Sequence, residues 1–187
     1  GHGVEKVSRA AIAGGASYLG VATLQEGIQL RKLNIECPIL ILGNLTSVNE
    51  LNSCLYWNLL PTISSLNEAK ICQNIASSSR CQFKVHLKVD TGMTRLGCDL
   101  KNALNLFESL LQMNNISLEG IYSHLAMADG DLEGEAENVT SKQQEVFLNL
   151  SKKMSLAKDN LFFHLANSAG TLRDKKLHYD MVRVGLA

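Results

Sequence analysis

Hydrophobic positions recur along the chain at two spacings, one typical of amphipathic helices and the other of short buried strands. Helical spacing is found over residues 4–15, 23–33, 46–57, 65–79, 100–114 and 138–158, and a short helical turn is expected over 168–173. Thr23 precedes Glu26 by three residues, which is the spacing of a capping box, and Ser65 is placed to cap the helix that follows it.

Apolar stretches of strand length lie between these helices, at residues 17–22, 38–43, 59–64, 81–90, 116–124, 161–166 and 181–186. A helical segment precedes each of the seven, and such strict alternation is typical of parallel βαβ units. One further strand before residue 4 would give eight, the number that closes a (β/α)8 barrel of the TIM type. We therefore expect an α/β fold in which residues 1–187 supply strands 2 to 8 of the barrel and lack its first strand.

The alternative is an open, doubly wound sheet. Neither G-x-G-x-x-G nor G-x-x-x-x-G-K-[ST] occurs in the chain, so a nucleotide-binding version of that sheet has no support.

Composition and charge exclude several classes of function. Apolar residues make up 45% of the chain, which indicates a globular domain, and 18 Lys plus Arg balance 18 Asp plus Glu. A neutral chain does not attract a polyanion, so nucleic-acid binding is not expected. No apolar run reaches the length of a membrane span, and no signal-peptide pattern opens the chain. Five cysteines without a C-x-x-C pair argue against a disulfide framework or a metal site, so we expect reduced thiols in a cytoplasmic protein.

Candidate chemistry lies where the expected strands end, because barrel active sites form at that rim. The residues there are Lys88, Asp90 and Arg95, His124, His164 with Asn167 and Ser168, and Arg183 with Gly185 and Leu186. The set is mostly cationic, which favours an anionic small molecule, and Ser168 with the N–H groups of Gly185 and Leu186 is suited to cradle a phosphate. Each residue also has an ordinary interpretation. An arginine at a strand end is often a salt-bridge partner, a lone histidine is often structural, as we expect for His86, and Lys88 can extend to solvent.

Several stretches together resemble one family. KVDTGMTRLG at 88–97 is similar to the signature of alanine racemases, fold-type III enzymes that use pyridoxal 5'-phosphate (PLP). GHG at 1–3 resembles the end of the family's PLP-lysine motif. The segments 21–31, 38–43, 120–129, 164–170 and 181–187 resemble further family segments in family order, so the resemblance covers the whole chain.

The resemblance implies roles for individual residues. Arg95 corresponds to the arginine that contacts the phenolic oxygen of PLP and helps to hold the substrate carboxylate. Lys88 corresponds to a lysine that is often carbamylated, and a carbamate would pair with Arg95. Arg183 corresponds to the arginine that faces the pyridine nitrogen, and His124 to a histidine near the ring. The remaining cofactor contacts implied are Leu42 along the cofactor, and Ser168, Gly185 and Leu186 around the phosphate, with Asn167 beside them.

The resemblance also implies what lies outside the chain. The family's Schiff-base lysine would precede Gly1, and its C-terminal β-domain, which supplies a tyrosine base and a homodimer interface, would follow Ala187. On this interpretation residues 1–187 are one partial PLP-binding barrel domain of an enzyme that supplies D-alanine for peptidoglycan, and they would not racemise alanine alone. Three alternatives stay open: another fold-type III enzyme, such as a D-threonine aldolase-like protein or a broad-specificity racemase; a non-catalytic single-domain PLP-binding protein; and a barrel that serves only as a binding scaffold.

Overall fold

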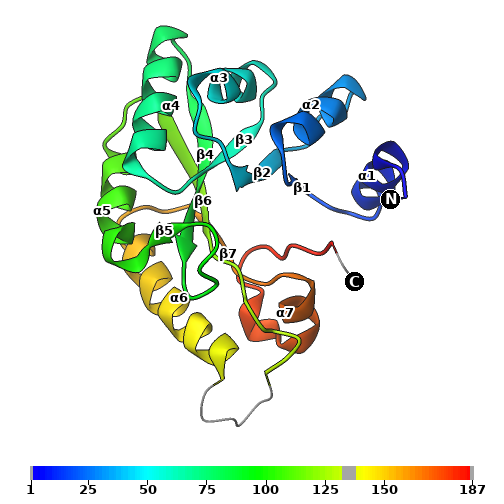
Figure 1. Cartoon of the computed structure of the whole chain (residues 1–187), viewed down its shortest axis with the longest axis vertical. Coiled ribbons are helices and arrows are strands. Elements are labelled where there is room, and N and C mark those ends of the chain that lie inside the picture. The colour runs from blue at the N-terminus through cyan, green and yellow to red at the C-terminus, as the bar shows by residue number, and fades with distance from the viewer. Residues whose placement is uncertain (1, 132–137, 186–187) are drawn as a thin grey trace.

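A curled parallel sheet forms the centre of the molecule (Figure 1). The computed structural model describes residues 2–131 and 138–185. The strands follow one another in the order β1-β2-β3-β4-β6-β7, and the short β5 pairs with β4. Their bounds are β1 Leu19–Val21, β2 Ile39–Asn44, β3 Leu60–Ile63, β4 Phe83–Asp90, β5 Cys98–Asp99, β6 Ile116–Tyr122 and β7 Phe162–His164. All the pairings are parallel, which confirms the α/β barrel-type fold predicted from the alternation.

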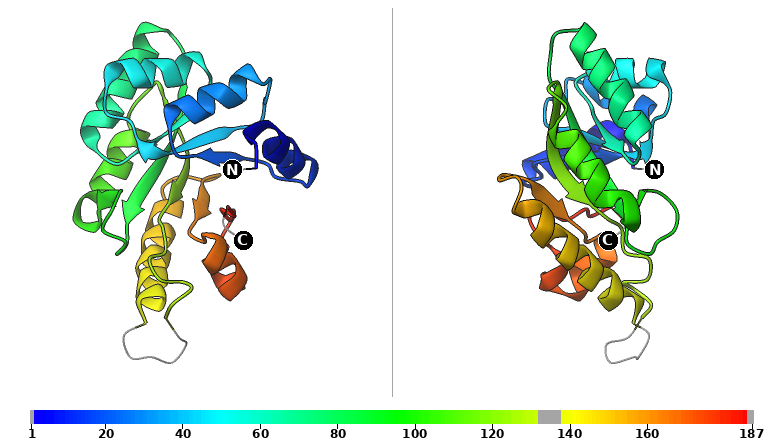
Figure 2. Two further views of the ribbon diagram at one scale, coloured as in Figure 1. Left: turned by 45° about the vertical axis from the view of Figure 1, so that its right-hand side comes forward. Right: turned by 90° about the vertical axis from the view of Figure 1, so that its left-hand side faces the viewer.

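Helices connect the strands and cover one side of the curled sheet, as Figure 2 shows for α3 to α6. They are α1 Val4–Ala13, α2 Leu24–Lys32, α3 Val48–Tyr56, α4 Leu66–Ser78, α5 Leu100–Leu111, α6 Val139–Ser155, α7 Ser168–Arg173 and the 3-10 turn η1 Lys175–Leu177. The predicted capping box of Thr23 and Glu26 is present, and Ser65 caps α4. None of the helices in the described residues is long and apolar enough to cross a membrane.

The last predicted strand, over residues 181–186, is wrong for the part that the structure describes. Residues 181–185 form no strand. Asp180 N–H donates to Phe163 O and Arg183 N–H to Ala166 O, both at 3.0 Å. These bonded residues are three apart, whereas the pleat of a strand brings alternate residues to the same side. The segment therefore lies beside β7 and the turn after it without joining the sheet.

The unpredicted β5 arises from the turn after β4. Gly97 has φ +129°, and a Cβ there would lie 2.7 Å from the backbone N of Asp90. Only glycine lets the chain fold back this closely, so that Cys98 and Asp99 pair with Val89 and Asp90. The loop that carries Arg95 is thus closed at both ends against β4.

Inside the curl, aromatic rings pack over the sheet. The rings of Tyr122 and His164 stack with their centres 4.6 Å apart, and the His86 ring meets that of His164 edge-on. A Cβ on Gly120 would lie 2.5 Å from His86 Cε1, so the ring of His86 occupies the space that a side chain would take. This packed layer forms the base on which the rim residues of β4 and β6 lie.

Candidate active site

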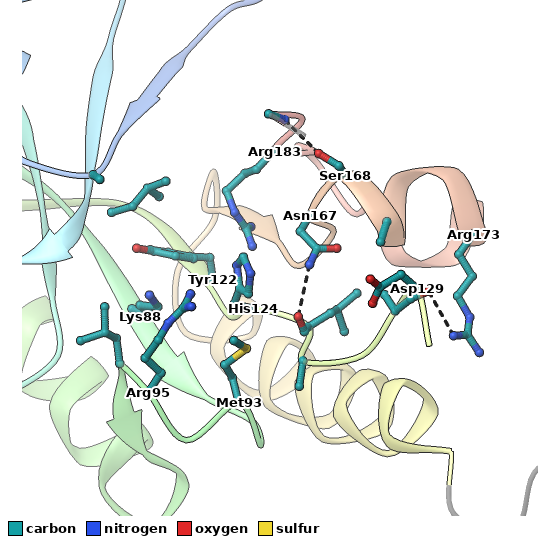
Figure 3. A pocket seen from close by; sticks show the side chains of 18 of the residues that line it. Lys88, Met93, Arg95, Tyr122, His124, Asp129, Asn167, Ser168, Arg173 and Arg183 are labelled. Atoms are coloured by element: carbon teal, nitrogen blue, oxygen red, sulfur yellow. Dashed lines mark hydrogen bonds between the residues drawn. The ribbon is translucent and has the colours of Figure 1, made fainter. Parts of the chain in front are cut away.

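The loop after β4 is shaped by Asp90. Its Oδ1 accepts hydrogen bonds from the N–H groups of Gly92 and Thr94, at 2.9 and 3.0 Å. Side-chain bonds of this kind stabilise a tight turn, and here the turn directs Arg95 toward the mouth of a cavity (Figure 3). Asp90 therefore serves the turn and forms no ion pair with Lys88 or Arg95 among the described residues.

The cavity has a volume of about 980 Å³ and lies at the carboxyl ends of the strands. It collects the site residues predicted from separate parts of the sequence: Leu42, Lys88, Arg95, His124, Asn167, Ser168, Arg183 and Gly185. Leu186 lies outside the described residues. His86 and His164 are completely buried, as expected for structural histidines, and do not line the cavity.

Lys88 is held in an unusual environment. It is 4% exposed, and its Nζ lies 5.4 Å from the centre of the Tyr122 ring. Within residues 2–131 and 138–185 its ammonium group has neither a hydrogen bond nor an ion pair. Burial, followed by the positive charges of Arg95 and Arg183, lowers the pKa of Lys88 to about 8. A substantial fraction of the Lys88 side chains is therefore neutral, and nucleophilic, at mildly alkaline pH.

Arg183 is anchored by three of its five N–H groups. Nη2 donates to Ser123 O at 2.6 Å and to Leu165 O at 3.0 Å, and Nη1 donates to His164 Nδ1 at 2.9 Å. Burial lowers the pKa of Arg183 to about 10, which leaves it charged at neutral pH. The Nε–H and one Nη1–H have no acceptor in the described part of the chain. Arg183 thus presents a fixed cation with two available donors at the cavity.

The anchor also sets the protonation of two buried histidines. Since arginine only donates, His164 Nδ1 must accept, and the proton of the neutral ring lies on Nε2. His164 Nε2 then donates to His86 Nδ1 at 3.1 Å. Burial and the charge of Arg183 lower the pKa of both histidines, of His86 to about 3. Both rings therefore stay neutral beside the guanidinium group.

His124 lies at the rim with its ring toward the cavity (Figure 3). Burial lowers its pKa to about 4, and the charges of Arg183, Arg95 and Lys88 act in the same direction. A neutral imidazole at pH 7 offers one donor and one acceptor, so His124 can orient a polar ligand without adding charge.

Tyr122 was missed by the sequence analysis. Lys88 Nζ and Arg183 Cζ lie 5.4 and 5.1 Å from the centre of its ring, and its hydroxyl is 2.7 Å from Thr62 Oγ1. Burial raises the pKa of Tyr122 to about 12, so the ring stays neutral between the two cations. The sequence did contain an indication of this role. Side chains alternate between the two faces of a strand, so Tyr122, two residues before His124, is expected on the same face as His124.

The predicted phosphate cradle is brought together only in part. Gly185 N–H donates to Ser168 Oγ at 2.9 Å, which joins the segment after Arg183 to the start of α7. Asn167 caps α7, since its Oδ1 accepts from Gly170 N–H, and its Nδ2 donates to Leu125 O. Asn167 therefore shapes the cavity wall, and the Gly185 N–H must exchange Ser168 for any phosphate oxygen.

A second unpredicted feature clamps the loop after β6. The Asp131 side chain is 5% exposed, and it pairs with Arg173 and accepts from both the N–H and the hydroxyl of Thr140. Arg173 also donates to Ala128 O. This clamp ties the loop to both α6 and α7, and Arg173 lines the cavity.

Removing this clamp is expected to change the acid stability of the fold. Burial alone would raise the pKa of Asp131, but the bonds from Thr140 and Arg173 hold it below its ordinary value. A depressed carboxyl pKa gives stability that is present above the unfolded value of about 3.9 and is lost as the pH falls through the folded value. We expect Asp131→Asn to lower the free energy of unfolding by about 1–3 kcal/mol at pH 7, and by progressively less below about pH 4.

Urea unfolding monitored at pH 7 and at pH 3 measures this difference. Asp129→Asn, which removes an exposed carboxylate two residues away, is the control and should change stability by less than about 0.5 kcal/mol at either pH. Equal losses for Asp131→Asn at both values of pH would contradict the assignment.

The sequence of this chain is similar to those of known proteins. The family "Alanine racemase, N-terminal domain" matches residues 1–187. The alanine racemase of Prochlorococcus marinus is 57% identical over 187 residues, covering 100% of this chain and 48% of the relative.

Solved structures of alanine racemases are also similar to this chain. An alanine racemase of Clostridium difficile 630 superposes with a TM-score of 0.91 at 33% identity, over 100% of this chain and 48% of that one. The alanine racemase from Bacillus anthracis with bound L-Ala-P gives a TM-score of 0.86 at 33% identity, over 100% of this chain and 47% of its own. This chain thus spans about half the length of the proteins that it matches.

Proposed function

Because this chain belongs to the family of alanine racemase N-terminal domains, we propose that it is the barrel portion of a PLP-dependent alanine racemase, which interconverts L- and D-alanine. The observation that carries the proposal is the anchored guanidinium of Arg183, with two donors available at a cavity that also holds Lys88, Arg95 and His124. Such a site suits a flat, anionic ligand whose ring contains a hydrogen-bond acceptor.

The residues present fit PLP. When bound, PLP supplies an electron sink that makes the Cα proton of an amino acid acidic. We assign Arg183 to the ring nitrogen, Arg95 and His124 to the polar edge of the ring, and Leu42 to its flank. For the phosphate group we assign Ser168, Gly185 and Leu186, with Asn167 shaping the wall beside them.

Arg183 controls where a proton can reside. Its pKa of about 10 is far above that of a pyridine nitrogen, so it donates a hydrogen bond to that nitrogen without giving up the proton. A pyridine ring held by Arg183 would therefore withdraw electrons less strongly than one that faces an acid. Weaker electron withdrawal would favour return of a proton to Cα, and so racemisation over transamination.

Lys88 and Arg95 act together in the proposed function. A neutral Lys88 amine can react with CO2, forming an N–C bond and releasing a proton, and the resulting carbamate carries a negative charge. That charge would attract Arg95 and orient it toward the ligand. The lowered pKa of Lys88 supports this assignment, since the reaction requires the neutral amine.

The assignment extends to partners. We propose alanine as the substrate, a second copy of the full-length enzyme as the subunit partner, and D-alanine for peptidoglycan as the product used by a cytoplasmic pathway. Racemisation requires a base on each face of Cα. We place those two bases, a lysine and a tyrosine, in parts of the enzyme other than residues 1–187.

The test uses the whole product of the gene, purified with PLP. We expect an absorbance band of protein-bound PLP and conversion of L-alanine to D-alanine, followed by circular dichroism or by a D-amino acid oxidase assay. Bound PLP with turnover of another amino acid, but not alanine, would indicate a different fold-type III enzyme. Absence of any bound PLP would indicate a binding scaffold.

A further inference from the structure

Gln143, on α6, is a buried amide that lies directly beneath the rim. It is 2% exposed, and each of its hydrogen bonds reaches another segment. Its Oε1 accepts from Ala126 N–H at 2.9 Å, and its Nε2 donates to His124 O at 2.9 Å and to Thr91 Oγ1 at 3.1 Å. One side chain therefore joins the turn after β4 to both sides of the His124 turn.

The donor and the acceptor of each hydrogen bond in this network can be assigned. Ala126 N–H can only donate and His124 O can only accept, so the orientation of the Gln143 amide follows from its partners. Thr91 Oγ1 accepts from Nε2, which leaves its own proton for Ser123 Oγ, 2.7 Å away. A carboxylate would place an oxygen against His124 O, and a thioether would leave Ala126 N–H and His124 O without these partners.

These bonds converge on the segments that carry the site. Thr91 opens the turn that ends with Arg95, and the backbone of His124 positions its ring. Ser123, at the end of the hydroxyl chain, accepts Arg183 Nη2 through its carbonyl at 2.6 Å. Gln143 does not line the cavity, yet Lys88, Arg95 and His124 lie on segments that it joins, and Arg183 bonds to one of those segments.

We propose that Gln143 is a positioning residue for the reaction, setting the placement of Arg95, His124 and Arg183 relative to one another. This inference rests on the proposed racemase function for its kinetic consequence, while its structural part stands alone. Enzyme rates are sensitive to such placement, since a misplacement of about 1 Å can reduce the rate about 100-fold.

Three variants of the whole gene product test the proposal. Gln143→Glu retains an acceptor for Ala126 N–H but opposes His124 O, and Gln143→Met removes all three bonds. Gln144→Glu makes the same chemical change one position further along α6, at a partly exposed residue, and is the matched control. We expect kcat per PLP-loaded site to fall about 10- to 100-fold in both Gln143 variants, and to stay within about twofold of wild type in Gln144→Glu.

A readout that does not depend on activity separates positioning from simple loss of folded protein. In the cofactor-free protein, hydrogen exchange at the Ala126 amide should accelerate at least about tenfold in Gln143→Met but much less in Gln143→Glu, which retains the acceptor. The absorbance of bound PLP should also shift in both Gln143 variants, because the groups around the ring are displaced. A purely structural role would lower the amount of folded enzyme and leave kcat per loaded site and the spectrum unchanged, which would overturn the proposal.

Thr91 provides a second test in case the Gln143 variants do not fold. Thr91→Val removes the hydroxyl that links Nε2 to Ser123, and Thr91→Ser keeps it. We expect Thr91→Val to lower kcat per loaded site about three- to tenfold and Thr91→Ser to restore it; equal rates in the two would contradict the network. If wild type does not racemise alanine, the proposed function fails, whereas unchanged Ala126 exchange in Gln143→Met would reject the positioning role itself.

Discussion

Replacing Arg183 with glutamate in the whole gene product is expected to slow alanine racemisation about 10- to 100-fold and to increase transamination to pyruvate. The donors that Arg183 presents to the cavity are lost, and a charge-assisted hydrogen bond is worth about 1.5–3 kcal/mol, which corresponds to that range of rate. A carboxylic acid there can also give its proton to the ring nitrogen. Stronger electron withdrawal would favour protonation at positions other than Cα.

The experiment compares racemisation with pyruvate formation in the same samples. Arg183→Lys is the control, because it keeps the charge but lacks the planar group that reaches Ser123, Leu165 and His164 together. It should slow racemisation without raising the share of transamination. An Arg183→Glu enzyme with an unaltered ratio of the two products would argue against the assignment of Arg183 to the ring nitrogen.

Lys88→Ala is expected to lower the racemisation rate about 10- to 100-fold, because Arg95 would lose the anion that orients it. The missing element is a negative charge, so added acetate or chloride should restore part of the activity. Lys84→Ala, which removes an exposed lysine from the same strand, is the control and should have no such effect. Its ammonium only approaches Glu119 at 3.9 Å on the surface.

Carbamate formation at Lys88 is expected to depend on pH. Carbamate formation needs the neutral amine, whose fraction grows as the pH rises through about 8. At equal concentrations of dissolved CO2, re-formation of the carbamate after CO2 has been removed should therefore be faster at pH 9 than at pH 7. A crystal structure of the PLP-loaded enzyme gives the direct answer. Density that ends at Nζ, with Lys88 directed away from Arg95, would disprove the carbamate.

Features set by local chemistry were predictable from the sequence. The capping box at Thr23 and Glu26 needs only residues three apart. The ends of β4 and β6, beside Lys88 and His124, follow from apolar runs that stop at polar residues. Because parallel strands share one direction, such ends meet at one rim, which is why separate motifs converged on one cavity.

Features that depend on distant partners were not predictable. Gln143 meets Thr91 across 52 residues and Arg173 meets Asp131 across 42, and no local pattern distinguishes such residues from other polar residues on or beside a helix. The error over residues 181–186 has a similar origin. An apolar run shows that a segment is partly buried, but strand formation also depends on hydrogen-bond spacing that the neighbouring segment decides.

The concentration of positive charge at the rim has a consequence for the folding of the chain itself. Lys88, Arg95 and Arg183 have no ion-pair partner within residues 2–131 and 138–185, so their mutual repulsion opposes compaction for as long as Lys88 remains an ammonium group. An anion that enters the cavity removes part of that repulsion, and by mass action it stabilises the folded form in proportion to the logarithm of its concentration. If PLP binds as proposed, its concentration would then also set how much of this chain stays folded.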